Sequence, residues 1–387
     1  MLQTESPFTY GPPAPELDVL ERVIEHVVAP EAGVVDREGK FPLRSVRALA
    51  DAGLGMLPLP KEVGGQGARM SVYAEALARI AAVCGSTSTV YMTQMHCAHP
   101  IHLAGREDQQ RWIPRLSSAQ AIGAIALTEP DAGSDVASMR TMARRDGDVY
   151  VINGSKIFIS NGDVADVIVL FTTVDPARGK DGITAFLVET AGLAGFSAGR
   201  PMVKLGQKGA STVELSFDDC RIPAHAVLGE VGRGYDLLLR SVQRSRISAA
   251  AQGVGFAAGA FDATVRHFAT RGLLSAGRRD AQDLHFALAE LNAEIVAARA
   301  MLHAVCDLVD EGDGDPTVEV SMLKLHCTAV GVRVAARCVE LLGEAGDDVA
   351  IGVERRLRDA KIAEIYDGTN QVQSMLVARG IRLAATS

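Results

Sequence analysis

The sequence predicts an α+β fold with a helical domain at residues 1–121, a β domain at 122–232 and a helical bundle at 233–387. Three observations support this division. Apolar residues recur at helical spacing in the first third, short runs rich in β-branched and aromatic residues fill the middle third, and only one proline follows Pro223. At 387 residues the chain is long enough for two or three domains of ordinary size.

The first domain is expected to be helical. Leu17, Leu20 and Ile24 are separated by three and four residues, as on one face of a helix. Segments rich in glycine and proline at 53–60 and 64–67 break this spacing. Because such residues tolerate tight turns, a loop between helices is predicted there.

The middle domain is expected to consist of β-strands. Asn153 and Gly154 lie between two of the apolar runs, and this dipeptide is typical of a hairpin because both turn residues take positive φ. A hairpin turn is therefore predicted at this point. The expected strands are 121–127, 149–152, 156–159, 166–171, 183–188 and 212–217.

The last domain is expected to be an up-down four-helix bundle, because proline is nearly absent from it. Its one proline, Pro316, follows Asp315 as a first helical residue follows its N-cap. The expected helices are 234–271, 280–311, 315–342 and 354–384, and these lengths suit such a bundle.

Charge and composition exclude several classes of function. The 39 Lys and Arg residues against 47 Asp and Glu residues give a net charge of −8, which argues against general nucleic-acid binding. No apolar run of about 18 residues is present, so no membrane span is expected. Residues 1–13 lack the pattern of a secretory signal, and the six scattered cysteines form no C-x-x-C pair. These features predict a cytoplasmic protein with reduced thiols.

Motifs for other chemistries have simple structural interpretations. His96, His99 and His102 could ligate a metal, but Pro100 is expected to disrupt the helix and no carboxylate joins them, so pocket-lining or buried roles are favoured. Residues 253–258 loosely fit a dinucleotide fingerprint inside a helical run, where close helix packing is favoured. The G-x-S-x-G motif of serine hydrolases is absent from the sequence.

Three segments carry a more specific signal. Residues 126–138 close a strand with a turn dense in hydroxyls and backbone amides, which suits a polar ring edge and a phosphate. Phe158 and Ser160 alternate onto one sheet face, where an aromatic ring beside a hydroxyl can stack on and bond a flat heterocycle. Asp367 precedes Gly368 where a helix is interrupted, so its carboxylate can face a cavity.

Together these segments resemble the acyl-CoA dehydrogenase family, and the resemblance covers nearly the whole chain. Residues 126–138 match the family's first signature, and 60–67 and 365–369 stand where the family has similar residues. The resemblance implies an N-terminal helical domain, a central β-sandwich or barrel and a C-terminal four-helix bundle. It also implies FAD between the β domain and the bundle, and a homo-oligomer, usually a tetramer built as a dimer of dimers.

The resemblance also implies roles for individual residues. Thr128 would bond the flavin pyrimidine, Ser134 would bind near the pyrophosphate and the substrate, Phe158 would cover the flavin ring, and Ser160 would reach toward its N5. Arg246 would lie at the substrate near the catalytic base. The other residues implied for the FAD site, some of them serving a neighbouring subunit, are Arg271, Gln282, Thr369 and Gln371.

The chain departs from the family pattern at the base. Asp367 stands where the family usually has a glutamate, whose side chain is one methylene longer. Asp367 is the expected base. Branched-chain members move the base to a position that is Ser245 here, which carries no carboxylate. Glu364, one turn before Asp367, is the weaker candidate.

The family's second signature is also altered. Glu340, Glu344 and Asp347 bring negative charge near an expected FAD phosphate, and residues 272–275 replace the family's usual loop. Because like charges repel the diphosphate, reduced FAD affinity is expected.

The activity that the resemblance implies is α,β-dehydrogenation of an acyl thioester, from acyl-CoA to 2-enoyl-CoA, in fatty acid metabolism. Asp367 would remove the α-proton as the flavin N5 accepts the β-hydride, and an electron-transfer flavoprotein would receive the electrons. Three alternatives stay open. They are oxidation of a carrier-protein-bound (acyl-ACP) group in secondary metabolism, a flavin monooxygenase on the same fold, and a non-catalytic member with a degraded FAD site.

Overall fold

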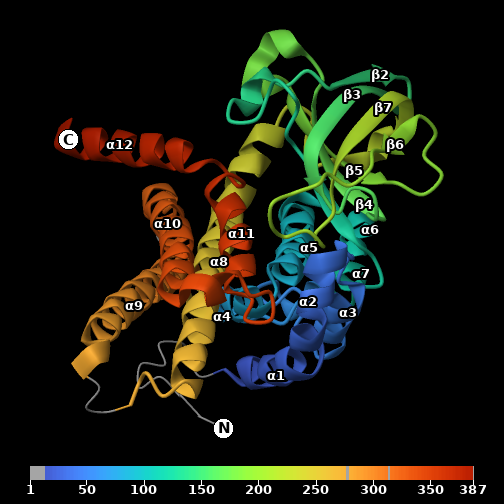
Figure 1. Cartoon of the computed structure of the whole chain (residues 1–387). Coiled ribbons are helices and arrows are strands. Elements are labelled where there is room, and N and C mark those ends of the chain that lie inside the picture. Colours follow the sequence, from blue (N-terminus) through green and yellow to red (C-terminus); the bar gives the residue numbers. More distant parts are fainter. Residues whose placement is uncertain (1–13, 276–278, 313, 387) are drawn as a thin grey trace.

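The computed structural model describes residues 14–275, 279–312 and 314–386 and shows three regions in chain order (Figure 1). Helices of the first third (blue to cyan) contact both the β domain (green) and the long helices of the last third (yellow to red). The predicted order of helical, β and helical regions is therefore confirmed. None of the helices in the described residues is long and apolar enough to cross a membrane. The expectation about a secretory signal concerns residues 1–13, which lie outside the described residues.

The first region is helical, and its central helices α4 and α5 are buried along most of their length. A π-helical turn at Ile24–Val28 joins α1 to α2, and the predicted loop separates α3 from α4. The helices are α1 (Pro15–Val23), α2 (Ala29–Glu38), α3 (Leu43–Asp51), α4 (Met70–Val83), α5 (Gly85–Ala104), α6 (Glu107–Gln110) and α7 (Trp112–Ser117).

Pro100 does not disrupt its helix, so that expectation is wrong. The residue lies inside α5, which continues to Ala104. A proline removes one helical N–H group, and here the surrounding stretch from Cys97 to Ile101 is buried against neighbouring elements. Tertiary packing thus holds the helix together past the missing hydrogen bond.

The β domain is built on one sheet with the strand order β6-β7-β3-β2-β4-β5-β8, and β1 pairs with β4 in parallel. Alternate residues of β4 belong to two cores. Ile168 and Leu170 pack inside the β domain, while Val169 and Phe171 pack against the helices. Burial on both faces explains the uninterrupted apolar run of this strand. The strands are β1 (Gly123–Ala126), β2 (Met142–Asp146), β3 (Val149–Ser160), β4 (Val167–Thr173), β5 (Ile183–Glu189), β6 (Phe196–Ala198), β7 (Thr212–Pro223) and β8 (Val227–Leu228).

The hairpin predicted at Asn153 and Gly154 is wrong. Both residues lie within β3, which continues along β7 on either side of them. The register with β7 shifts between Ile152 and Gly154, so the dipeptide forms a bulge and not a turn. The actual turn between β2 and β3 contains Gly147, whose φ is 61°.

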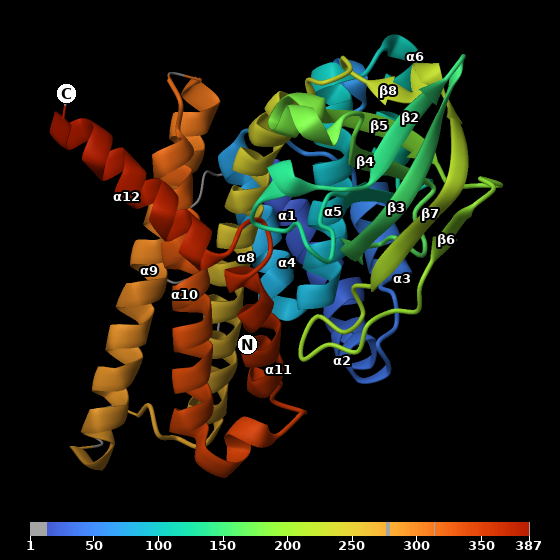
Figure 2. The same cartoon turned by 90° about the horizontal axis from the view of Figure 1, so that it is seen from above.

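The last region is a helical bundle followed by a projecting helix (Figure 2). The helix expected at 354–384 is two helices, α11 and α12, with a 3-10 turn at Ile362–Glu364 and a sharp redirection after it. Helix α12 leaves the bundle and carries the exposed side chains of Met375 and Ile381. The helices are α8 (Gly234–Thr270), α9 (Gln282–Glu311), α10 (Thr317–Leu342), α11 (Val353–Lys361) and α12 (Asn370–Thr386).

The glycines of α8 serve close helix packing, as predicted. A Cβ added at Gly253 would lie 2.4 Å from the carbonyl oxygen of Cys327 on α10. One added at Gly255 would lie 2.2 Å from the carbonyl oxygen of Ala78 on α4. Because these contacts are within one chain, the small residues of α8 give no support for contact between chains.

Candidate active site

Asp367 lies at the helix break between Ile362–Glu364 and α12. Its φ is 55° and that of Gly368 is 87°, so two successive residues take the left-handed conformation and redirect the chain. Thr369 then caps α12, because its Oγ1 accepts the N–H of Val372 at 3.3 Å. The break therefore holds Asp367 in a defined place between two helices.

The Asp367 carboxyl is surrounded by side chains from three other helices. Burial raises its pKa, and His96 on α5, Lys324 on α10, and Ser245 and Arg246 on α8 oppose that rise. Its Oδ2 atom is buried and has no hydrogen-bond partner among the described residues. A buried carboxyl with a raised pKa and an unpartnered oxygen suits a general base.

Lys324 and Arg246 hold positive charge near this carboxyl. Lys324 is fully buried, and its Nζ donates to Asn370 Oδ1 at 3.0 Å. Burial lowers the pKa of Lys324 to about 8. Arg246 donates from Nη1 to Ser321 Oγ at 3.4 Å, while its Nε is buried without a partner in the described part of the chain.

The two other positions considered for the base are engaged elsewhere. Glu364 Oε2 accepts a hydrogen bond from Lys361 Nζ at 2.6 Å. Ser245 Oγ donates to the carbonyl of Val242, in its own helix, at 2.9 Å. Of these candidates in the described residues, Asp367 is the one that offers a buried carboxyl oxygen without a partner.

Phe158 stands on a second bulge of β3. The register with β7 shifts between Lys156 and Ile159, and the φ of Phe158 is 60°, which is rare for an aromatic residue. Its side chain is 62% exposed, whereas Lys156 two residues earlier is fully buried. The bulge leaves an aromatic ring at the surface with Ser160, half-buried, two residues beyond it.

The segment 126–138 lies directly beside this bulge. The carbonyl of Thr128 accepts the N–H of Ile157 at 2.9 Å, which joins the segment after β1 to β3. Thr128 is half-buried, and Ser134 is exposed in the loop that follows. An exposed aromatic ring bordered by hydroxyls and loop amides fits the ring and phosphates of FAD.

Sequence reasoning missed a buried ion pair beneath this loop. Lys156 Nζ lies 2.7 Å from Glu129 Oε1 and also donates to the carbonyl of Leu127 at 2.9 Å. Simple alternation would place Lys156 on the same face as Phe158. Only the bulge turns Lys156 inward, and a bulge leaves no clear signal in a single strand's sequence.

Four of the predicted FAD residues lie away from the surface formed by Phe158 and the segment 126–138. Arg271 and Gln282 are exposed, and Arg271 lies about 37 Å along α8 from Arg246 at 1.5 Å per residue. Thr369 and Gln371 lie instead at the start of α12, next to Asp367. The same remote end of the bundle (Figure 2) carries the exposed acidic residues Glu340, Glu344 and Asp347.

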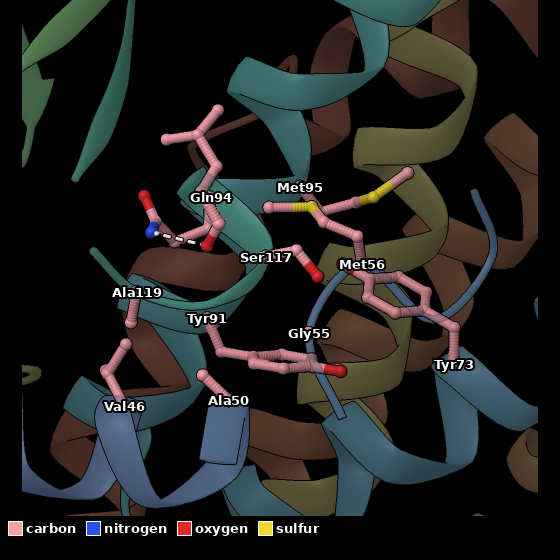
Figure 3. Close-up of a pocket in the computed structure, with 11 residues that line it drawn as sticks. Val46, Ala50, Gly55, Met56, Tyr73, Tyr91, Gln94, Met95, Ser117 and Ala119 are labelled. Carbon is pink, nitrogen blue, oxygen red and sulfur yellow. Dashed lines mark hydrogen bonds between the residues drawn. The ribbon is translucent and has the colours of Figure 1, made fainter. Parts of the chain in front are cut away.

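A small pocket lies among the N-terminal helices (Figure 3). Tyr73 and Tyr91 line it, with ring centroids 6.0 Å apart, and Gln94 donates to the carbonyl of Leu116 at 3.3 Å. None of the residues predicted for the active site lines this pocket.

The three histidines of α5 differ in their surroundings. His99 and His102 each have a buried Nδ1 atom without a partner among the described residues. Within that part of the chain, no group of three or more His, Cys, Asp or Glu side chains is arranged to hold a metal ion. The buried Nδ1 atoms of His99 and His102 fit the buried role that the sequence favoured, whereas His96 acts on Asp367.

The fold and the site define a flavin-dependent dehydrogenase of acyl thioesters. The chain belongs to the acyl-CoA dehydrogenase family, whose N-terminal, middle and C-terminal domains match residues 17–120, 124–220 and 232–382. The protein is therefore an enzyme of this FAD-dependent family, and its general activity is acyl-CoA dehydrogenation.

Three known proteins illustrate the similarity. "Acyl-CoA dehydrogenase, short-chain specific" of Clostridium acetobutylicum is 36% identical over 356 residues, covering 92% of this chain and 93% of its own length. The structure of butyryl-CoA dehydrogenase from Megasphaera elsdenii is 31% identical with a TM-score of 0.89, covering 95% of this chain and 97% of that one. The structure of the prolyl acyl carrier protein oxidase AnaB is 27% identical with a TM-score of 0.86, covering 95% and 98%.

Proposed function

We propose that Asp367 is the base that removes the α-proton of an acyl thioester as a hydride leaves the β-carbon. The observation that carries this proposal is the buried, unpartnered Oδ2 of Asp367 at the helix break. When ionised, that oxygen can accept a proton, and the cations of Lys324 and Arg246 favour its ionised form.

The thioester oxygen needs a hydrogen-bond donor, because an α-proton is weakly acidic and its removal places charge on that oxygen. The backbone N–H of Asp367 bonds no acceptor among the described residues. It lies in the same residue as the proposed base. We assign it the role of supporting the thioester oxygen during proton removal.

FAD supplies the acceptor for the β-hydride when it is bound. The exposed ring of Phe158 and the hydroxyls around it support binding there. The residues proposed to hold the cofactor are Thr128, Ser134, Phe158, Ser160, Thr369 and Gln371, with Ser134 and Arg246 also at the substrate.

We also propose a homo-oligomer, a dimer or a tetramer, in which Arg271 and Gln282 serve the FAD of a neighbouring subunit. Their distance along the bundle from Arg246 supports this, as do the exposed apolar side chains of Ile381 and Leu383 on the projecting α12. Sedimentation of the FAD-loaded protein tests the proposal. A monomer that retains FAD tightly would contradict it.

An electron-transfer flavoprotein is the proposed electron acceptor, in keeping with the family. A cytoplasmic location is proposed as well. All six cysteines are free and buried, which suits a reducing compartment.

A carrier-protein thioester is the second candidate substrate. The likeness of this chain to the prolyl acyl carrier protein oxidase AnaB favours it. Both candidates use the same proton removal at Asp367 and differ in the group that carries the acyl chain.

Anaerobic titration of the purified protein with acyl-CoA and acyl carrier protein thioesters tests the function. We expect a yellow protein whose flavin absorbance is lost on addition of an acyl-CoA. Loss only with carrier-protein thioesters would select the second candidate. A colourless protein that takes up no FAD would point to a non-catalytic member. Hydroxylation of the substrate in a parallel aerobic reaction would point to a monooxygenase.

A further inference from the structure

His96 lies among the groups around Asp367, yet the proposed proton transfer makes no use of it. Its ring nitrogen Nε2 lies 3.2 Å from Ser248 Oγ, and the hydroxyl of Tyr73 lies 3.0 Å from the same oxygen. A polar chain therefore crosses three helices, α4, α8 and α5, beside the proposed base.

The hydrogen bonds of Ser248 bear on the tautomer of His96. Ser248 has a single hydroxyl proton, and the carbonyl of Arg244 is an acceptor for it at 3.2 Å. With the proton placed there, the Ser248 oxygen accepts from both Tyr73 and His96. In this arrangement His96 Nε2 carries a proton, and Nδ1 of a neutral ring is an acceptor. Burial lowers the pKa of His96, and the charge of Asp367 opposes that shift.

His96 Nδ1 has no partner within the described residues, as judged by the hydrogen bonds around it. It is not sealed in the interior, in contrast to the buried Nδ1 atoms of His99 and His102. The charge of Asp367 acts on the ring and raises its pKa against the effect of burial. Two unpartnered polar atoms, one on His96 and one on Asp367, thus belong to the same site.

We propose that His96 selects the acyl group of the substrate, with Nδ1 accepting a hydrogen bond from a hydroxyl or amino group on the acyl chain. The substrate class is then a hydroxyacyl or aminoacyl thioester and not a plain alkyl one. This inference rests on the proposed function of the Asp367 site.

The physical basis is the cost of leaving a polar atom unpaired. A plain alkyl chain against Nδ1 would displace water and leave the acceptor unsatisfied, whereas a hydroxyl or amine satisfies it. A site built in this way rejects an analogue that lacks the donor. We expect a preference of about tenfold or more over an alkyl group of the same size.

Binding to the Asp367→Asn protein with bound FAD tests the inference, since the loss of the base prevents turnover. The probes are 3-hydroxybutyryl-CoA against 3-methylbutyryl-CoA and 4-hydroxybutyryl-CoA against pentanoyl-CoA, which replace a hydroxyl by a methyl group. The 3-amino and 4-amino analogues distinguish an amine from a hydroxyl. Calorimetric dissociation constants should be about tenfold lower for at least one hydroxy or amino thioester than for its alkyl partner.

Variants assign the preference to His96. His96→Leu in the same background should abolish it, while the matched control His102→Leu, further along the same helix, should keep it. Ser248→Ala leaves the imidazole in place but removes the partner of Nε2, and it should weaken the preference. The melting temperature and the flavin spectrum report whether each variant is folded.

Two results would overturn the inference. The first is equal or tighter binding of the alkyl thioesters by the protein with His96 intact. The second is a preference that survives in folded His96→Leu. Failure of the proposed function looks different, because then no thioester bleaches the flavin of the unmodified protein, whereas bleaching by alkyl thioesters without preference defeats only the role of His96.

Discussion

Lys156 and Glu129 form a buried ion pair, Nζ to Oε1 at 2.7 Å, between β3 and the segment that follows β1. The exposed fractions of the two side chains are 0% and 6%. Glu129 also accepts the backbone N–H groups of Arg140 and Thr141, at 2.6 and 3.0 Å. Because Phe158 lies just beyond Lys156, this carboxylate joins the bulge that carries Phe158 to the loop beside it.

Lys156→Met should destabilise the protein strongly, because it leaves the Glu129 carboxylate buried and unpaired. We expect a loss of about 3–5 kcal/mol in the free energy of unfolding, together with weaker FAD binding. The control is Arg111→Met, which breaks an exposed pair with Glu189 of the same 2.7 Å length and should cost about 1 kcal/mol or less. Urea unfolding measures both, and equal losses would show that burial of the pair is unimportant.

The order and type of the elements could be predicted from sequence, whereas the details of β3 could not. Apolar periodicity is a local property, so the runs at 166–171 and 183–188 identified β4 and β5. The bulges at Gly154 and Phe158 depend on pairing with β7, which lies more than 50 residues away along the chain. The Asn-Gly dipeptide was therefore interpreted as a turn when it is a bulge.

The candidate site likewise contains residues that the sequence could identify and residues that it could not. Asp367 could be singled out because Gly368 and the broken helix are visible in its own segment. Its neighbours His96 and Lys324 come from α5 and α10, and only helix packing brings them to it. His96 stands out in the sequence only as one of three histidines spaced by three residues, and no local pattern marks Lys324.

Glu75 on α4 should make stability depend on acid pH. Burial alone would raise its pKa, but the hydrogen bond with His303 at 3.3 Å and the charges of Arg299 and Arg79 lower it to about 2. The pKa of glutamate in an unfolded chain is about 4.3. The ionised form of Glu75 therefore stabilises the folded state above that pH. This contribution is lost as the pH falls from about 4.3 toward about 2.

Glu75→Gln should therefore lower the free energy of unfolding at neutral pH and flatten its dependence on pH in the acid range. Urea unfolding at a series of pH values measures the slope. Glu21→Gln, at the exposed end of the same network, is the control and should change little. An acid slope that Glu75→Gln leaves unaltered would mean that another carboxylate is responsible.

Gly255→Ala should destabilise the contact between α8 and α4. The added Cβ would meet the Ala78 carbonyl oxygen at 2.2 Å, which the backbone must move to relieve, and we expect a loss of about 1–3 kcal/mol. Gly33→Ala in α2 is the control, because nothing lies within 4 Å of its added Cβ. Gly33→Ala should stabilise the folded protein by about 0.4–1 kcal/mol. Thermal unfolding should therefore show a lower melting temperature for Gly255→Ala and a higher one for Gly33→Ala.

Lys324→Met should shift the pH dependence of flavin reduction. Burial raises the pKa of Asp367 and Lys324 opposes that rise, so loss of the cation should raise the pKa further. Because the base acts when ionised, activity falls as pH falls, and the acidic limb of the profile should move to higher pH. Lys361→Met, which removes the partner of Glu364, should leave the profile in place. A pH profile that does not move in Lys324→Met would show that the charge of Lys324 does not affect the pKa of the base.

Asp367 itself gives the most direct test of the mechanism. Asp367→Asn is nearly isosteric and should keep the fold and the bound FAD, but its amide cannot take a proton. Flavin reduction by the substrate should fall by more than the roughly 10²–10⁴-fold typical of a lost general base, since Glu364 is held by Lys361 and Ser245 has no carboxylate. Near-normal reduction in Asp367→Asn would place the base elsewhere.

Asp367→Glu then asks whether the pocket is shaped around the shorter acid. Asp367 takes a left-handed φ of 55°, which aspartate tolerates better than most residues and glutamate less well. The extra methylene would also carry the carboxylate beyond its present place among His96 and Lys324. If the pocket fits aspartate, Asp367→Glu should lose rate with little change in substrate affinity, because a misplacement of about 1 Å can cost 10²-fold. If the pocket merely accepts a short base, the longer side chain should preserve or raise the rate, and single-turnover reduction distinguishes the two.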